Sequence, residues 1–147
     1  MDNQLIKIWS KLRPEDKLAI FRETGERAGL PATAIEKDWY VSLVLSIVFS
    51  TEFADQLVFK GGTSLSKGWN LIERFSEDID LAIDRKYLGF EGDMSKSQVE
   101  KLRKTSCAFI CSDFANAISV KIDEMEVGLT LVIPDFKASN TDPLSFR

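Results

Sequence analysis

The sequence predicts one α+β (α/β) domain in which N-terminal helices precede a mixed sheet core with flanking helices. Two observations predict this fold class. Apolar residues recur at helical spacing from the N-terminus to Phe49, and short β-type runs then alternate with further helical segments. With 147 residues, 44% of them hydrophobic, the chain is long enough for one domain with its own core. We therefore expect residues 1–147 to form a single domain.

Two helices are expected before Pro31. Residues 3–13 carry apolar side chains at helical spacing, and Pro14 interrupts that pattern and restarts it. The second helix is expected to stop at Gly29, because glycine tolerates the left-handed conformation of a helix end and Pro31 cannot continue the helix. The residues of this helix that are expected to face inward are Leu18, Phe21 and Ala28.

The middle of the chain is expected to run helix, strand, glycine turn, helix, strand. Thr33 and Glu36 have the spacing of a capping box, so we expect them to open a largely apolar helix that runs to Phe49. The elements expected after it are a strand at Leu57–Lys60, a turn at Gly61 and Gly62, a helix at Ser64–Arg74 with Leu65, Trp69 and Ile72 on one face, and a strand at Asp78–Ile83.

The C-terminal part is expected to hold one long helix, or two shorter ones, and a strand. Helical spacing resumes at Ser95 and continues to Ile118. The run "VGLTLVI", residues 127–133, is typical of a strand, and "SNTDPLSFR" resembles the approach to another.

Composition excludes several kinds of chemistry. The chain has no histidine and only two cysteines, so it cannot assemble a zinc cluster or a Ser-His-Asp or Cys-His site from its own residues. The longest apolar stretch, residues 39–49, falls well short of the ~20 residues that cross a bilayer. No N-terminal signal pattern is visible, and we expect a cytoplasmic protein without a membrane segment. Any catalysis must use carboxylates, lysines, hydroxyls or a hard metal.

Asp78 and Asp80 are the candidate metal ligands and catalytic residues. At positions i and i+2 of a strand they project from one face, while Ile79, Leu81 and Ile83 project from the other. Two unpaired carboxylates in apolar surroundings would be costly, and a divalent cation would remove that cost. With oxygen ligands alone the expected ion is Mg²⁺ or Mn²⁺.

The glycine turn is the candidate phosphate site. Gly61 and Gly62 let the backbone approach a ligand closely, and the next residues supply hydroxyl and amide donors at a helix start. The nucleotide-binding residues we expect are Gly61, Gly62, Thr63, Ser64 and Lys67. A phosphate site joined to metal-binding acids by one helix is typical of phosphoryl or nucleotidyl transfer.

Each feature also has a purely structural interpretation. A Gly-Gly pair often makes only a turn, Asp-x-Asp occurs on the solvent face of edge strands, and Lys67 alone is typical of a solvated helix surface. The same holds for basic residues in the long helix that could guide RNA, namely Lys96, Lys101, Arg103 and Lys104. The ordered combination of the first three features favours a functional site.

The stretch "FKGGTSLSKGWNLIERFSEDIDL" resembles the AbiEii/AbiGii toxin family, nucleotidyltransferase-like toxins of type IV toxin–antitoxin and abortive-infection systems within the DNA polymerase β-type nucleotidyltransferase superfamily. Upstream, "AIEKDWYVSLVL" is also similar to the family's N-terminal helix. The resemblance implies a nucleotidyltransferase-type mixed sheet core. It also implies transfer of NMP from an NTP to an RNA end such as tRNA, with Mg²⁺ as cofactor and a cognate antitoxin as partner.

The resemblance also assigns roles to residues. It places Gly61, Gly62, Thr63 and Ser64 on the triphosphate and Asp78 and Asp80 on the metal. Two basic positions match the family, Lys67 as a phosphate contact and Arg74 with no settled role. An acid-Lys-Asp triplet matches Glu36, Lys37 and Asp38.

The resemblance weakens toward the C-terminus. Family members carry a further acidic residue and a lysine beyond the strands seen here, so we expect this chain to lack the family's C-terminal part. Asp123, Glu124 and Asp135 are candidates for a third carboxylate, and the spacing favours none of them. The alternative hypothesis is therefore a catalytically incomplete module that binds a nucleotide or an antitoxin.

Overall fold

The computed structural model describes residues 3–71 and 78–133. The elements follow in the order α1 (Asn3–Ser10), α2 (Pro14–Ala28), α3 (Ala32–Val48), η1 (Ala54–Gln56), β1 (Leu57–Lys60), α4 (Gly61–Thr63), η2 (Ser64–Gly68), β2 (Asp80–Ile83), α5 (Lys96–Phe109), η3 (Ile110–Phe114) and α6 (Ala115–Met125). Of the short elements, η1 is a 3₁₀ turn, whereas η2 and η3 are π-helical. Helices combined with a two-stranded sheet confirm the predicted α+β class.

The boundaries of α2 follow directly from its sequence. Pro14 occupies the start of the helix, where its missing N–H costs no hydrogen bond, and Glu15 and Asp16 lie in the first turn, where negative charge is favourable. Gly29 ends the helix with a left-handed φ of 68°. The predicted limits at Pro14 and Gly29 are therefore confirmed.

Other details of the N-terminal helices differ from the prediction. α1 ends at Ser10 rather than at residue 13. In α2 only Phe21 of the three predicted inward residues is buried, because Leu18 is 41% exposed and Ala28 also lies at the surface.

The predicted capping box at Thr33 is also wrong. α3 begins after Pro31, whose extended backbone leads directly into the helix, and no side chain caps that start. A capping box forms instead at the start of α5, where the Ser95 side chain accepts a hydrogen bond from the Gln98 backbone N–H and the Gln98 side chain accepts one from the Ser95 backbone N–H.

Aromatic side chains pack the first three helices together. The Trp9 ring lies 4.5 Å from the Trp39 ring and 5.1 Å from the Phe21 ring, measured between centroids. The main core lies deeper. Its buried residues are Ile6, Leu43, Ile47, Val48, Phe109, Phe114, Ile118, Ile122 and Met125. Residues of α1, α3 and the C-terminal helices therefore share one core.

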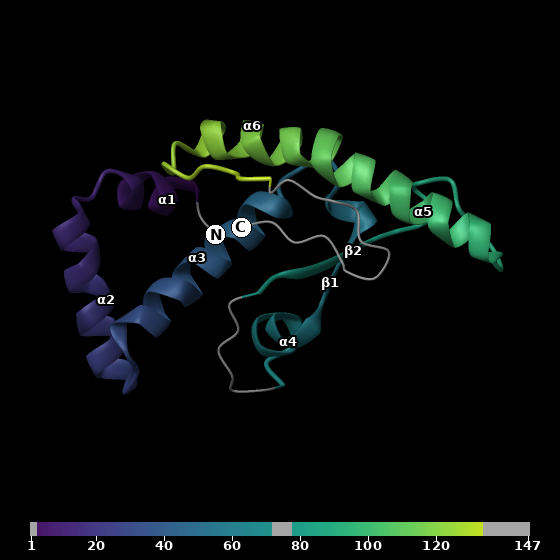
Figure 1. Ribbon diagram of the computed structural model, residues 1–147. Helices are drawn as coiled ribbons and strands as arrows, with labels where there is room; N and C mark the ends of the chain where they lie inside the picture. The colour runs from purple at the N-terminus through teal and green to yellow at the C-terminus, as the bar shows by residue number, and fades with distance from the viewer. Residues whose placement is uncertain (1–2, 72–77, 134–147) are drawn as a thin grey trace.

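Of the two arrangements expected after Ser95, one long helix or two shorter ones, the structure shows one continuous helical segment. α5, η3 and α6 follow one another without a break and form a rod that runs above α3 and the sheet (Figure 1). Phe109, on this rod, packs against Phe53 with ring centroids 4.9 Å apart. Because Phe53 lies just before η1 and β1, this contact joins the rod to the segment that leads into the sheet.

The sheet consists of β1 and β2, paired antiparallel with Leu57 opposite Ile83 and Lys60 opposite Asp80. Leu81 and Ile83 pack against the core, which confirms the predicted apolar face of β2. The strand predicted at residues 127–133 is wrong, since this segment has no regular secondary structure. Its alternate residues Val127, Leu129 and Leu131 do pack against the core, so one-sided burial produced the alternation without a paired strand. The stretch "SNTDPLSFR" lies outside the described residues.

Candidate active site

The glycine turn joins β1 to α4 without an intervening loop. Lys60 has extended backbone, and Gly61 begins the helix with a φ of +75°, a conformation that favours glycine. A Cβ atom built on Gly61 would lie 2.0 Å from Oδ2 of Asp80. The carboxylate of Asp80 therefore lies directly against the backbone of the turn, and only glycine fits there.

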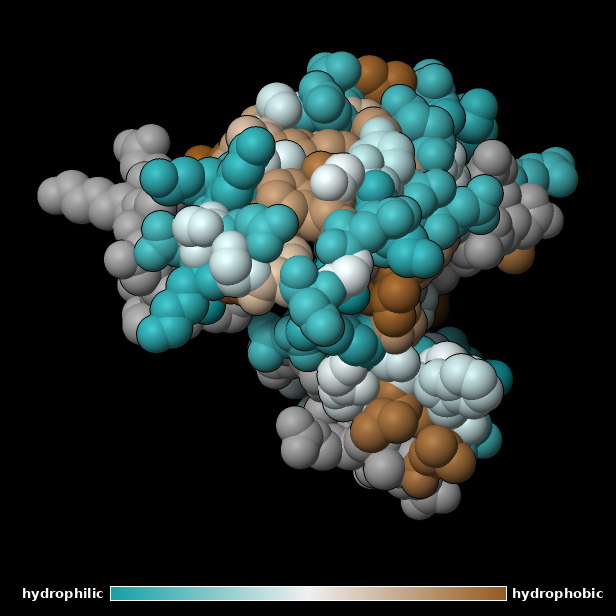
Figure 2. Space-filling view, turned by 90° about the vertical axis from the view of Figure 1, so that its right-hand side faces the viewer, coloured by the Kyte–Doolittle hydropathy of each residue, from teal (hydrophilic) through white to brown (hydrophobic). Residues whose placement is uncertain are grey.

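The helix that follows the turn ends earlier than the predicted Arg74, and part of it is π-helical. After α4 it continues as the π-helical η2 and ends at Gly68, and Asn70 then takes a positive φ of 52°. Two residues of the predicted apolar face lie at the surface, because Leu65 is 42% exposed and Trp69 is 71% exposed. Figure 2 shows apolar side chains at the surface of the lobe that this turn forms below the main body. Ile72 and Arg74 lie outside the described residues.

Thr63 connects the turn to the segment that carries the acids. Its hydroxyl Oγ1 donates a hydrogen bond of 2.5 Å to the main-chain oxygen of Asp78, and the residue is only 1% exposed. The predicted phosphate contact of Thr63 thus involves a side chain that already has a buried partner within the protein. Ser64 beside it is 5% exposed, whereas Gly61 is exposed and Gly62 half-buried.

The two aspartates lie at the start of β2 and not within an apolar face. The strand begins at Asp80, and Asp78 precedes it by two residues. Both side chains are exposed, so the expectation that they face apolar surroundings is wrong. The predicted alternation of the strand is correct from Asp80 onward. The two acids, however, lie on the solvent side near the edge of the sheet.

Asp78 and Asp80 are suitable ligands for a hard divalent cation, but a complete set of protein ligands is not found among the described residues. Asp78 and Asp80 form no ion pair with the lysines and arginines of the described residues. Exposed carboxylates without a cationic partner are a suitable pair for Mg²⁺, which takes one or two carboxylates together with substrate phosphates and water. The described residues contain no cluster of three or more acidic, cysteine or histidine side chains able to hold a metal ion.

The candidates for a third carboxylate lie elsewhere or outside the described residues. Asp123 and Glu124 are on α6, whose end packs near α1 (Figure 1). Glu124 accepts a hydrogen bond from Lys121 Nζ at 2.8 Å. Asp135 lies outside the described residues. Neither α6 residue joins Asp78 and Asp80 in a metal-binding group.

Lys67 contacts α3, which sequence reasoning did not foresee. Its Nζ lies 2.7 Å from Oδ1 of Asp38 and donates a hydrogen bond of 2.8 Å to Oγ of Ser42. Asp38 and Ser42 are four residues apart and so project from the same side of the helix. The spacing of Asp38 and Ser42 could have indicated a shared polar face on the helix. The sequence contains no pattern that connects this face to Lys67, 25 positions after Ser42.

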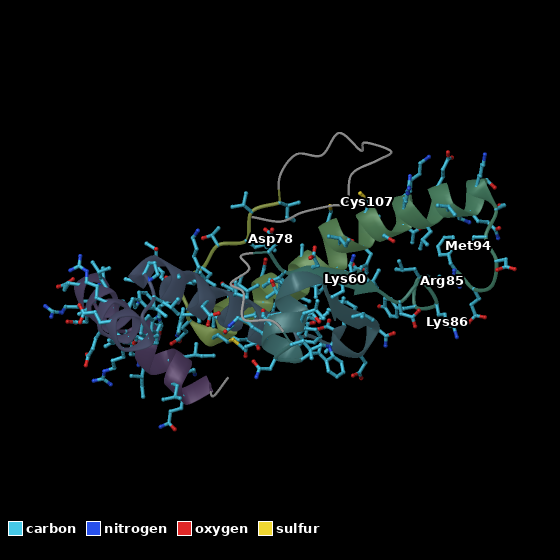
Figure 3. All side chains as sticks on the ribbon, turned by 90° about the horizontal axis from the view of Figure 1, so that it is seen from below. Lys60, Asp78, Arg85, Lys86, Met94 and Cys107 are labelled. Atoms are coloured by element: carbon cyan, nitrogen blue, oxygen red, sulfur yellow. The ribbon has the colours of Figure 1, made fainter. Side chains whose placement is uncertain are left out.

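The basic residues Arg85 and Lys86 lie away from Asp78 (Figure 3), whereas Lys60 on β1 lies opposite Asp80 in the sheet. In Figure 3, Arg85 and Lys86 lie with Met94 beside the start of α5, whereas Asp78 lies near the middle of the molecule. The basic residues of α5 named above are exposed, as a solvated helix surface would be. Their role in guiding RNA stays a prediction.

A known protein family covers the part of the chain that holds the turn and the acids. The family model described as nucleotidyl transferase AbiEii toxin of a type IV toxin–antitoxin system matches residues 44–139. That span covers more than half of the chain and includes Gly61, Lys67, Asp78 and Asp80. The chain belongs to the AbiEii family. The resemblance carried by "FKGGTSLSKGWNLIERFSEDIDL" is thereby confirmed.

Family membership establishes the broad class of the AbiEii chain. It is a member of a nucleotidyl transferase toxin family, and a toxin of this kind has a cognate antitoxin. Neither the curated proteins nor the solved structures gave a match to it. Within residues 3–71 and 78–133, no helix combines the length and the apolar character needed to cross a bilayer.

Proposed function

We propose that this chain is a metal-dependent nucleotidyltransferase that moves NMP from an NTP to an RNA end such as that of tRNA, as the toxin of a toxin–antitoxin or abortive-infection system in the cytoplasm. In this reaction an acceptor hydroxyl oxygen bonds to the α-phosphorus, the bond from the α-phosphorus to the bridging oxygen breaks, pyrophosphate leaves and the hydroxyl proton passes to solvent. We further propose that residues 1–147 act as one nucleotidyltransferase-like domain.

The contact between Gly61 and Asp80 is the observation that carries this proposal. It places a carboxylate against the backbone of a helix start, a position where backbone amide groups can bind phosphate. A metal-binding acid and a phosphate-binding turn must adjoin one another if one ion is to bridge protein and triphosphate. A purely structural turn has no need of this neighbour.

Each residue has a distinct role in the proposed site. Asp78 and Asp80 would hold Mg²⁺ or Mn²⁺, which when bound neutralises phosphate charge and polarises the α-phosphoryl group. The backbone at Gly61 and Gly62, with Thr63 and Ser64, would orient the triphosphate. Lys67 would add positive charge to the phosphates. These residues act by positioning and by charge stabilisation.

Label transfer tests the proposal. Purified protein is incubated with each of the four α-³²P-labelled NTPs, Mg²⁺ or Mn²⁺, and total tRNA. We expect one or more NTPs to label the RNA, and we expect Asp80→Ala to lower the rate by at least about a hundredfold, the scale of losing a group that stabilises transition-state charge. Asp84→Ala is a matched control, because Asp84 is an exposed aspartate just after β2. Equal transfer by Asp80→Ala and the unaltered protein would refute the proposal.

A second candidate function is favoured by one observation, the lack of a third metal-binding carboxylate among the described residues. In this alternative the chain binds a nucleotide or its antitoxin without turnover. Calorimetry with each NTP and Mg²⁺ separates the two. Binding without label transfer supports the binding module, and absence of binding counts against both candidates.

A further inference from the structure

We propose that Asp38 and Ser42 on α3 are positioning residues that hold Lys67 for contact with the phosphates of the nucleotide. This inference rests on the proposed function and deepens it, since it extends the site to a helix that carries neither the glycine turn nor the metal-binding acids. It also gives a role to Asp38, the last residue of the triplet Glu36, Lys37 and Asp38.

The geometry at Lys67 is that of a held ammonium group. Nζ lies 2.7 Å from the carboxylate oxygen Oδ1 of Asp38 and 2.8 Å from Oγ of Ser42. Both partners come from one face of α3, so they fix the ammonium from a rigid element and not from a loop. The Lys67 side chain is 23% exposed and that of Asp38 is 40% exposed, which leaves the pair partly shielded from solvent and still accessible.

The donors of Lys67 are not exhausted by these contacts. A lysine ammonium has three N–H donors; Ser42 accepts a hydrogen bond from one of them, and Asp38 lies at ion-pair distance. The ammonium therefore keeps donor capacity for a phosphate oxygen. Lys67 also lies within η2, in the same short helix that the glycines open. A flexible side chain held at two points loses less conformational freedom when it binds a ligand than one that is free.

A held lysine differs from a simple structural ion pair in a measurable way. An exposed ion pair that only joins two helices contributes little to stability, and it works equally well if its charges are exchanged. A lysine held for phosphate does not tolerate exchange, because exchange would turn a carboxylate toward the triphosphate. The two roles are therefore separable by experiment.

The first test measures NTP binding by calorimetry and steady-state label transfer in single variants. We expect Asp38→Asn to weaken Mg·NTP binding and raise KM about tenfold, with kcat nearly unchanged, as for loss of a partly shielded ion pair that acts equally in the ground and transition states. Ser42→Ala should cause a smaller loss of about threefold. Glu52→Gln is the matched control, an exposed carboxylate beyond α3 whose loss removes the same charge, and it should bind NTP normally.

The second test exchanges the charges. The double variant Asp38→Lys with Lys67→Asp should recover the thermal midpoint lost in either single variant, yet it should not recover NTP binding. Recovery of both would show a merely structural pair and overturn the inference. Equal NTP affinity in Asp38→Asn and the unaltered protein would also overturn it.

Failure of the inference is distinguishable from failure of the proposed function. If the unaltered protein binds and transfers NTP while Asp38→Asn does both equally well, only the role of Asp38 is lost. If Lys67→Met loses binding while Asp38→Asn does not, Lys67 acts without being held, and the inference is again overturned. If the unaltered protein neither binds nor transfers any NTP, both fail together.

Discussion

At the scale of single residues, Gly61 is the position where sequence and site constrain each other most tightly. A side chain there would meet Asp80 Oδ2 at 2.0 Å and would also require φ near +75°. A non-glycine residue pays about 1–2 kcal/mol for a left-handed conformation even before the clash with the carboxylate. The requirement for glycine is therefore both conformational and steric.

We predict that Gly61→Ala displaces Asp80 and weakens Mg·NTP binding by at least about tenfold, since a tenfold change corresponds to about 1.4 kcal/mol, within the cost of the strain alone. Calorimetry with Mg·NTP and circular dichroism of the same sample separate lost binding from unfolding. Gly68→Ala is the matched control, because a Cβ at Gly68 meets no atom within 4 Å. Normal NTP binding by Gly61→Ala would contradict the assigned contact.

At this scale, the sequence indicated a glycine turn beside two acids, because a glycine pair and alternating aspartates are local patterns that can be recognised without the structure. It did not indicate that the Thr63 hydroxyl is bonded to Asp78 or that Lys67 is held by α3. Those contacts join residues 15 and 25 positions apart, and periodicity records only which face a residue shares with its near neighbours.

At the scale of elements, the hydrogen bond from Thr63 fixes α4 relative to the start of β2. Asp78 has no strand partner of its own, because β2 begins two residues later. Within residues 3–71 and 78–133, the buried hydroxyl is therefore a contact that ties Asp78 to the turn. A side chain predicted to touch phosphate has at least this positioning role as well.

We predict that Thr63→Val lowers both stability and nucleotide binding. Loss of the hydroxyl leaves the Asp78 carbonyl oxygen without its donor, which should cost about 1–3 kcal/mol of unfolding free energy in urea denaturation. Mg·NTP affinity should fall because Asp78 is no longer fixed. Thr63→Ser keeps the hydroxyl and should retain most of the binding, and a Thr63→Val protein that binds as well as Thr63→Ser would contradict the role.

The elements that were predicted best are those with strong local signals. Pro14 and Gly29 set the ends of α2 through their own backbone preferences. The π-helical segments η2 and η3 could not be predicted, because one widened turn changes the apolar spacing too little to distinguish it from an α-helix. The false strand at residues 127–133 arose because alternation reports burial on one side and does not require a partner strand.

At the scale of the whole molecule, one aromatic cluster connects the long rod to the segments around the sheet. The Phe109 ring contacts the rings of Phe53, Tyr87 and Phe114 at centroid distances of 4.9, 5.7 and 5.9 Å. Phe53 precedes β1, and Tyr87 follows β2. If this cluster joins the rod and the sheet as firmly as the geometry indicates, the helices and the glycine turn must unfold together.

We predict a single cooperative unfolding transition, as expected for one domain of this size. In the variant Trp9→Phe with Trp39→Phe, Trp69 is the only remaining tryptophan of the three in the chain, so its fluorescence reports on the turn while far-ultraviolet circular dichroism reports on the helices. Both signals should share one urea midpoint. Adding Phe109→Ala should lower the urea midpoint of both signals together. The expected loss of unfolding free energy is about 3–5 kcal/mol.

Val120→Ala is the control for this last experiment, because Val120 is 46% exposed on the same rod, and such a surface change should cost within about 0.5 kcal/mol. Two separate midpoints in the starting variant would mean that the turn and the helices are independent units. In that case the active site would consist of the turn and β2 alone, and α3 would not contribute to its stability. A shared midpoint instead makes the hold of α3 on Lys67 part of the same cooperative structure that presents the glycines and the aspartates.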